Sequence, residues 1–201
     1  YTQTLNNIDL EIWHGERVGL IGPNGVGKSL LVKMVLGEIP LDAGEIELGP
    51  SVRLAYYSQE FETLDPALTL IDTVGRAGNF NESRSVAFLR KFGFDYAQRD
   101  TRVGALSGGE RARLQIALMT LSGANFLIMD EPTNHLDIPS SEFLEEALLD
   151  FEGSILAVSH DRYFLDRIAT RIVELSACRA TSFKGNYSDF VQKNSTLGAV
   201  Y

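Results

Sequence analysis

Residues 22–29 read GPNGVGKS, between the mostly apolar run 17–21 and the helix-compatible run 29–36. The spacing fits the phosphate-binding pattern G-x-x-x-x-G-K-[ST], in which backbone N–H groups surround phosphates, the lysine reaches the outer phosphates and the hydroxyl binds Mg²⁺. A helix that starts at such a loop adds its unpaired N–H groups and the positive end of its dipole. The stretch therefore predicts a strand, a loop and a helix that together hold the phosphates of a nucleotide.

Two side chains in this loop carry the predicted chemistry. Lys28 is the candidate cation for the β- and γ-phosphates, the alternative being an ordinary surface lysine. Ser29 is a candidate Mg²⁺ ligand and can also cap the helix with the same hydroxyl. The residues expected to contact the nucleotide here are Gly22, Pro23, Asn24, Gly25, Val26, Gly27, Lys28, Ser29 and Leu30.

Composition sets the broad class of the protein. The 201 residues, 44% of them hydrophobic, suffice for one α/β domain with a core, which predicts a single domain over 1–201. The net charge of −9 argues against a broad electrostatic grip on nucleic acid, so any RNA contact is expected to be local. One cysteine, Cys178, cannot form an internal disulfide. No stretch approaches the length of a membrane span, so we expect a cytoplasmic domain without membrane insertion.

Periodicity along the chain predicts three kinds of segment. Alternating residues predict strands at 8–12, 45–48 and 52–57, the last two belonging to an antiparallel β subdomain beside the nucleotide core. Helical segments predict an inserted helical subdomain at about 66–120. The apolar runs 126–129 and 155–158 predict buried parallel strands, which makes the core sheet mostly parallel.

Polar residues follow both of these buried strands, at the edge where open α/β sheets bind ligands. Asp130 and Glu131 come after the first strand, and His160 comes shortly after the second. Two adjacent carboxylates repel unless they share a cation or a proton, which favours a metal site over a solvated acidic turn. Glu131 is the candidate general base for an attacking water. His160 alone would more often be a structural histidine.

Residues 106–110 read LSGGE, which resembles the signature sequence of the ATP-binding cassette (ABC) superfamily, and DEPTNHLD at 130–137 and SHDRYF at 159–164 are in the same register. The resemblance implies the P-loop NTPase cassette fold, with Mg-ATP held between two cassettes. It assigns Asp130 to Mg²⁺ and Glu131 to catalysis, and it makes His160 the γ-phosphate switch.

The resemblance implies further contacts. In YYSQE, Gln59 would touch Mg²⁺ and the water, which makes Ser29, Gln59 and Asp130 the metal ligands and Glu131, His160 and Gln59 the catalytic group. Tyr1 would stack on adenine. The residues that would reach the ATP of the other cassette, or cross to it, are Ser107, Gly108, Gly109 and Asp137.

Three strings are similar to those of the ABC-F family: EPTNHLD where transporter cassettes usually read close to EPTSALD, SHDRYFLD, and GNYSDF near residue 190. ABC-F proteins have two cassettes on one chain, no membrane spans, and act on ribosomes in translation or antibiotic protection. The resemblance therefore implies one cassette of a longer protein, with a second cassette and the ribosome as partners.

The sequence also departs from the family. Leu30 stands where ABC proteins usually carry Thr, which removes one hydroxyl contact to the α-phosphate. The linker between cassettes is absent, and ELSACRATSF at 174–183 lacks an Asp-Gly hairpin turn.

Other functions remain as alternatives. A transporter cassette would need a membrane partner, and a module without turnover would need a defective Glu131, His160 or signature, all of which are intact. A chromosome-organising ATPase would need a long coiled coil, whereas only residues 29–129 separate Lys28 from Asp130.

Overall fold

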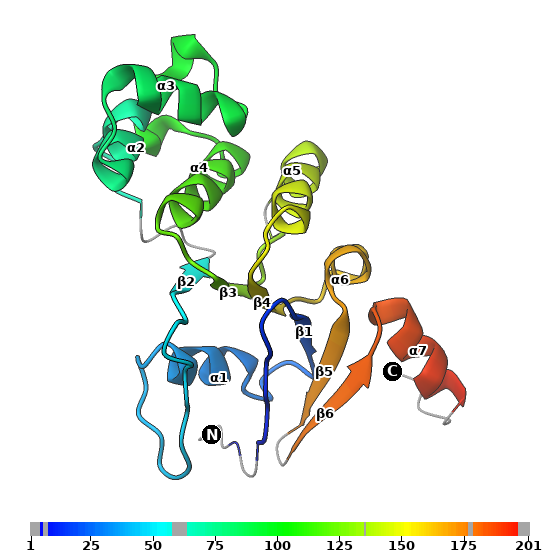
Figure 1. Ribbon diagram of the computed structural model, residues 1–201. Coiled ribbons are helices and arrows are strands. Elements are labelled where there is room, and N and C mark those ends of the chain that lie inside the picture. Colours follow the sequence, from blue (N-terminus) through cyan, green and yellow to red (C-terminus); the bar gives the residue numbers. More distant parts are fainter. Residues whose placement is uncertain (1–4, 6–7, 58–63, 135, 177–178, 197–201) are drawn as a thin grey trace. The chain divides into compact units, whose positions relative to one another are not determined.

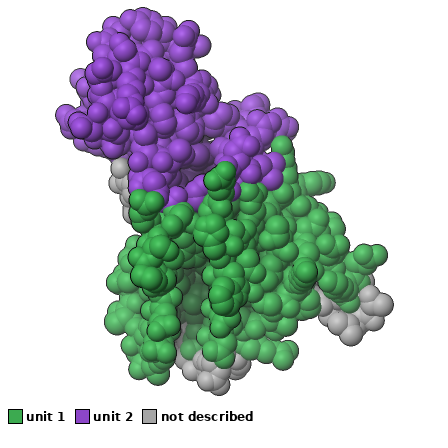
Figure 2. All heavy atoms as spheres, in the orientation of Figure 1, with its two compact units in different colours: residues 1–56, 125–133, 152–201 green, residues 57–124, 134–151 purple. Residues whose placement is uncertain are grey.

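The computed structural model describes residues 5, 8–57, 64–134, 136–176 and 179–196 (Figure 1). The chain forms two compact units, coloured separately in Figure 2. The first comprises residues 1–56, 125–133 and 152–201 and is called the sheet unit. The second comprises residues 57–124 and 134–151 and is called the helical unit.

The sheet unit is built on a six-stranded sheet in the order β2-β3-β4-β1-β5-β6. The central strands are parallel, β4 pairing with both β3 and β1, and β1 also with β5, while β5 and β6 form an antiparallel pair. The predicted α/β class with a mostly parallel sheet is therefore confirmed. The strands are β1 (Arg17–Ile21), β2 (Leu54–Tyr57), β3 (Phe126–Asp130), β4 (Ser154–Val158), β5 (Arg171–Ser176) and β6 (Arg179–Lys184). The helices of this unit are α1 (Lys28–Val35), α6 (Arg162–Ile168) and α7 (Tyr187–Thr196).

The register of these strands aligns the ends that carry the predicted site. Val158 of β4 lies opposite Leu20 of β1 on one side and opposite Asp130 of β3 on the other. The phosphate loop, the two acids and His160 therefore leave the sheet at the same edge, which is where open α/β sheets bind ligands. Every residue of β4 is buried, as expected for a strand with neighbours on both sides and both faces covered.

The helical unit has its own core. Apolar side chains from several of its helices and turns form one buried cluster, which includes Leu70, Leu89, Phe94 and Leu114. Side chains of Thr69, Asn81, Ser107 and Asp137 cap its four α-helices by accepting backbone N–H groups of the first turn. The elements are α2 (Leu70–Gly78), α3 (Glu82–Lys91), α4 (Gly108–Leu121) and α5 (Ile138–Leu149), with short 3₁₀ turns η1 (Tyr96–Gln98) and η2 (Val103–Ala105).

Two predicted strands do not form. Residues 45–48 have no regular structure, and every residue from 41 to 50 is exposed, so burial does not favour a strand there. At 8–12 the alternation itself is real, since Ile8, Leu10 and Ile12 pack on the sheet core while the acids between them are exposed. Within the described residues, however, segment 8–12 forms no strand ladder with a neighbouring strand. The third predicted strand begins at Leu54 and joins the main sheet beside β3, not a separate antiparallel sheet.

Candidate active site

The phosphate loop bridges β1 and α1 through glycines in left-handed backbone conformations. Gly22 has φ 151°, Gly25 has φ 77° and Gly27 has φ 111°. A Cβ on Gly22 would also lie 2.5 Å from the carbonyl oxygen of Leu175, so both the backbone angle and the space require glycine there. Gly27 is the N-cap of α1 and no side chain caps this helix. An N-terminus without an internal acceptor suits an external anion.

Lys28 lies inside this loop. Its side chain is 7% exposed, and Nζ donates to the carbonyl oxygens of Gly22 at 2.8 Å and Pro23 at 3.2 Å. Burial lowers the pKa of Lys28, and the carboxylates of Glu131 and Asp130 oppose that shift. The ammonium is thus already positioned within the loop predicted to hold phosphates. Pro23, Asn24 and Ser29 are exposed around it, whereas the Leu30 side chain offers no hydrogen bond.

Glu131 begins the turn after β3 in a strained conformation. Its φ is 47°, one of two positive values among the described non-glycine residues. Its N–H donates to Val158 at 2.8 Å, and the side chain is only 18% exposed. Burial raises the pKa of Glu131. A carboxylate with a raised pKa on a strained turn has the properties expected of a general base.

His160 is held against Glu131. The backbone N–H of His160 donates to Glu131 Oε2 at 3.3 Å, and its Nε2 lies 3.6 Å from Oε1. The turn is fixed by Ser159, which is fully buried and whose hydroxyl accepts the N–H of Asp161 at 3.0 Å. Asp161 in turn caps α6. Ser159 is a supporting residue that the motif analysis passed over.

In the helical unit, Ser107 and Glu110 form a reciprocal cap at the start of α4. The Ser107 N–H donates to Glu110 Oε2 at 2.8 Å, and Glu110 N–H donates to the Ser107 hydroxyl at 3.3 Å. The backbone hydrogen bond from Ser107 is the main cause of the lowered pKa of Glu110. The S-x-x-E spacing inside LSGGE was the available signal for this cap. Ser107 and Gly108 are exposed, whereas Gly109 is buried.

Asp137 has the same role at α5. Its side chain accepts the Ser140 N–H at 3.1 Å, and hydrogen bonds from the Ser140 hydroxyl and N–H lower its pKa. The structure therefore collects Lys28, Asp130, Glu131 and His160 in the sheet unit. Asp137 and residues 107–109 lie in the helical unit. Gln59 and Tyr1 lie outside the described residues.

The donor set fits Mg²⁺ better than a metal held by protein alone. No group of three or more His, Cys, Asp or Glu within the described ranges could hold a metal ion. Mg²⁺ typically takes one or two protein oxygens together with waters and substrate phosphates. The exposed Ser29 hydroxyl and the Asp130 carboxylate at the strand end supply such oxygens.

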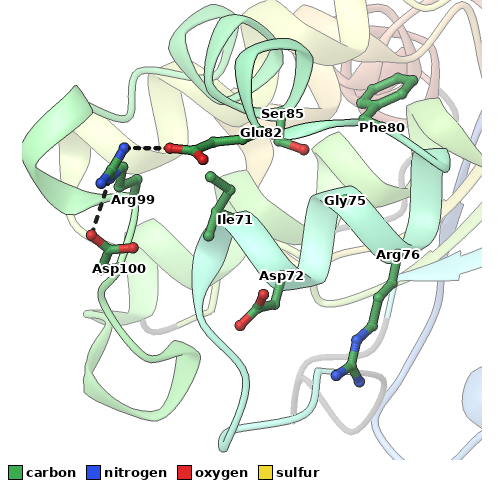
Figure 3. Close-up of a pocket in the computed structure, with 9 residues that line it drawn as sticks. All are labelled: Ile71, Asp72, Gly75, Arg76, Phe80, Glu82, Ser85, Arg99 and Asp100. Atoms are coloured by element: carbon green, nitrogen blue, oxygen red, sulfur yellow. Dashed lines mark hydrogen bonds and ion pairs between the residues drawn. The ribbon is translucent and has the colours of Figure 1, made fainter.

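A cavity of about 420 Å³ in the helical unit is a different feature (Figure 3). Its acids are already engaged: Arg99 contacts Glu82 at 2.6 Å and Asp100 at 3.0 Å, and Asp72 accepts the Thr69 hydroxyl at 2.7 Å. No residue predicted to bind the nucleotide lines it.

Residues 5–134, more than half of the chain, match the family model described as ABC transporter. The chain belongs to this family. The predicted ATP-binding ABC ATPase domain is thereby confirmed at the level of the family. None of the helices in the described residues is long and apolar enough to cross a membrane.

Relatives of this ABC domain agree with the resemblance to ABC-F proteins, which is confirmed. The Energy-dependent translational throttle protein EttA of Escherichia coli K12 is 41% identical over 97% of this chain and 36% of that protein. ABC transporter F family member 5 of Arabidopsis thaliana is 39% identical over 92% of this chain and 27% of that protein. The chain thus spans about a third of the length of these curated relatives.

A solved structure confirms the fold of the ABC domain. It is the dimer of the ATP-binding cassette MJ0796 in a post-hydrolysis state bound to ADP and Pi. The TM-score is 0.71 with 22% sequence identity, and the match covers 90% of each chain.

Replacing Lys28 by Ala is expected to weaken Mg-ATP binding at least about tenfold, or about 1.4 kcal/mol, because the outer phosphates lose the buried cation of this loop. Calorimetric titration measures the dissociation constant. Lys33→Ala is the matched control, because Lys33 is an exposed lysine on the same helix. Equal dissociation constants for Lys28→Ala and the parent would refute the assignment.

Replacing Glu131 by Gln is expected to raise the melting temperature at neutral pH, since it removes a half-buried charge next to Asp130. The folded pKa lies above the unfolded value near 4.5, so ionised Glu131 destabilises the fold above the raised pKa. The gain should shrink as pH falls through the raised pKa toward 4.5. Thermal melts across this pH range test it, with exposed Glu152→Gln as control. A pH-independent difference would contradict the explanation.

Proposed function

We propose that this chain is one cassette of a two-cassette ABC-F protein that binds and hydrolyses Mg-ATP and uses the cycle to act on the ribosome in the cytoplasm. The observation that carries the proposal is the half-buried Glu131 held against His160 at the sheet edge where the phosphate loop begins. The name of EttA refers to translation, which favours a translation factor over antibiotic protection for this chain.

Each residue of the site has its own role in ATP binding and hydrolysis. Lys28 neutralises the outer phosphates, and Ser29 and Asp130 hold the Mg²⁺, which supplies further charge neutralisation when bound. Glu131 accepts the proton of the attacking water, and its raised pKa brings it closer to the working pH. His160 contacts the γ-phosphate and, through its N–H, holds the Glu131 carboxylate in place.

The second half of the site comes from another cassette. The exposed Ser107 hydroxyl and the N–H groups of Gly108 and Gly109 form a helix start suited to a phosphate, and this helix start belongs to the helical unit, whereas Lys28 belongs to the sheet unit. The partner is the second cassette of the full protein, or a second copy when this chain is alone.

A composite site makes activity depend on association. The specific ATPase activity of the isolated chain is expected to rise with protein concentration, and Glu131→Gln is expected to abolish turnover while Mg-ATP accumulates a dimer. Enzyme dilution series and sedimentation with and without Mg-ATP measure the two effects. Constant specific activity together with a monomeric variant would reject the composite site.

Ribosome contact through this chain is expected to be small. Arginines gather after the signature, at 111 and 113, and after His160, at 162, 167 and 171. Some of them are already engaged: Arg113 donates to the carbonyl of Gly93 at 3.0 Å, and Arg171 contacts Glu16 at 3.1 Å. Arg162 is exposed at the start of α6. Against a net charge of −9, such a surface gives weak binding to a polyanion.

The isolated chain is therefore expected to bind ribosomes weakly, and the full protein, with Gln at position 131 and at its counterpart, to bind tightly. Cosedimentation through a sucrose cushion compares the two, with the parent protein in ADP as control. Retention of the locked protein by membranes instead of ribosomes would favour the transporter alternative.

A further inference from the structure

The beginnings of α4 and α5 meet at a notch that Gly109 leaves open. A Cβ built on Gly109 would overlap the Ser140 hydroxyl oxygen, lie 2.6 Å from Ser140 Cβ and lie 3.4 Å from Asp137 Oδ1. The side chain of Ser140 therefore occupies the volume where any other residue at position 109 would place its own. Gly109 is buried, so the close approach of the two helices is one reason for glycine here.

Ser140 also belongs to the cap of α5. Its N–H donates to Asp137 Oδ1 at 3.1 Å, and its hydroxyl is hydrogen-bonded to the same carboxylate. The Ser141 N–H donates to the Asp137 carbonyl at 2.9 Å. One serine thus contacts both the second residue of the signature helix and the aspartate that begins the next helix.

A second contact ties the same two helices one turn further on. The guanidinium carbon of Arg113, on α4, lies 5.7 Å from the ring centroid of Phe143, on α5, and 5.1 Å from that of Phe94. Arg113 also donates to the carbonyl of Gly93 at 3.0 Å. Two separate contacts, between Gly109 and Ser140 and between Arg113 and Phe143, therefore hold the starts of α4 and α5 together.

We propose that Ser140 is a positioning residue that couples the signature turn at the start of α4 to the Asp137 turn at the start of α5. When a phosphate of the other cassette binds Ser107 and Gly108, the α4 start becomes fixed. Ser140 then fixes Asp137 at the start of α5. The inference rests on the proposed function, because it makes the signature turn and the Asp137 turn, the two parts of this unit that the ABC resemblance assigns to contact with the other cassette, respond together to a bound phosphate.

The test adds a methyl group at position 109 on α4 and, in a second variant, also removes the Ser140 side chain that this methyl group would meet on α5. Gly109→Ala should accelerate hydrogen exchange of the Ser141 amide about tenfold and lower kcat with little change in the KM for ATP. Gly109→Ala with Ser140→Gly empties the space again, so both exchange and kcat should return most of the way to the parent. Ser140→Ala should produce a smaller increase in exchange, because it removes only the hydroxyl.

A matched control exists in the same unit. A Cβ on Gly75 of α2 would lie 3.3 Å from the hydroxyl oxygen of Ser85 on α3, another glycine–serine contact between helices. Gly75→Ala should lower the melting temperature without changing exchange at Ser141. This variant separates general loss of packing from the coupling.

The possible results separate failure of the coupling through Ser140 from failure of the proposed function. If the double variant does not recover kcat, the added methyl group obstructs the ligand and the coupling through Ser140 is wrong. If Ser141 exchange is the same in Gly109→Ala and the parent, the coupling is also wrong. Absence of concentration-dependent ATPase in the parent would instead reject the proposed function, while exchange at Ser141 still reports on the contact.

Discussion

The parallel pairing of β3, β4 and β1 is the constraint on which the active site depends. Val158 lies between Leu20 and Asp130 in register, so three chain segments far apart in sequence end at one edge. A shift of one residue would turn every side chain to the opposite face of the sheet. The buried aliphatic residues of these strands oppose such a shift, so the packing of the core also holds the chemical groups in position.

Strain at Glu131 follows from this register. Its N–H continues the ladder to Val158, and the chain must then turn away, which places a non-glycine residue at φ 47°. A left-handed conformation costs about 1 to 2 kcal/mol for such a residue, and burial of the carboxylate adds to it. The sheet holds the residue in this unfavourable state, and in return the carboxylate has a raised pKa next to His160.

Much of this arrangement could be predicted from sequence, because the phosphate loop and the ends of the apolar runs carry strong local signals. The glycines of 22–29, the two acids at the end of β3 and His160 after β4 all lie where those signals put them. The alternating segments at 8–12 and 45–48 failed as strand predictions for different reasons. At 8–12 the apolar side chains pack on the core without a strand ladder in the described residues, whereas at 45–48 every residue is exposed and no buried face supports a strand. The contact between Gly109 and Ser140 could not be foreseen, since it joins positions whose proximity only the packing of α4 against α5 creates.

Two helix caps of the helical unit involve residues to which the proposed function gives a second role. Ser107 and Asp137 each accept N–H groups that would otherwise have no partner within the helix. Under the proposed function, the same groups would meet a phosphate or the backbone of the partner cassette. Glu110 also accepts a hydrogen bond from the Ser107 hydroxyl at 3.0 Å. To bind a phosphate oxygen, the Ser107 hydroxyl must give up this bond, whereas the Ser107 N–H keeps its bond to the Glu110 carboxylate. The reciprocal cap therefore keeps one of its hydrogen bonds when the ligand replaces the other. Ligand binding then does not require unfolding of the first turn of α4, which Ser140 contacts.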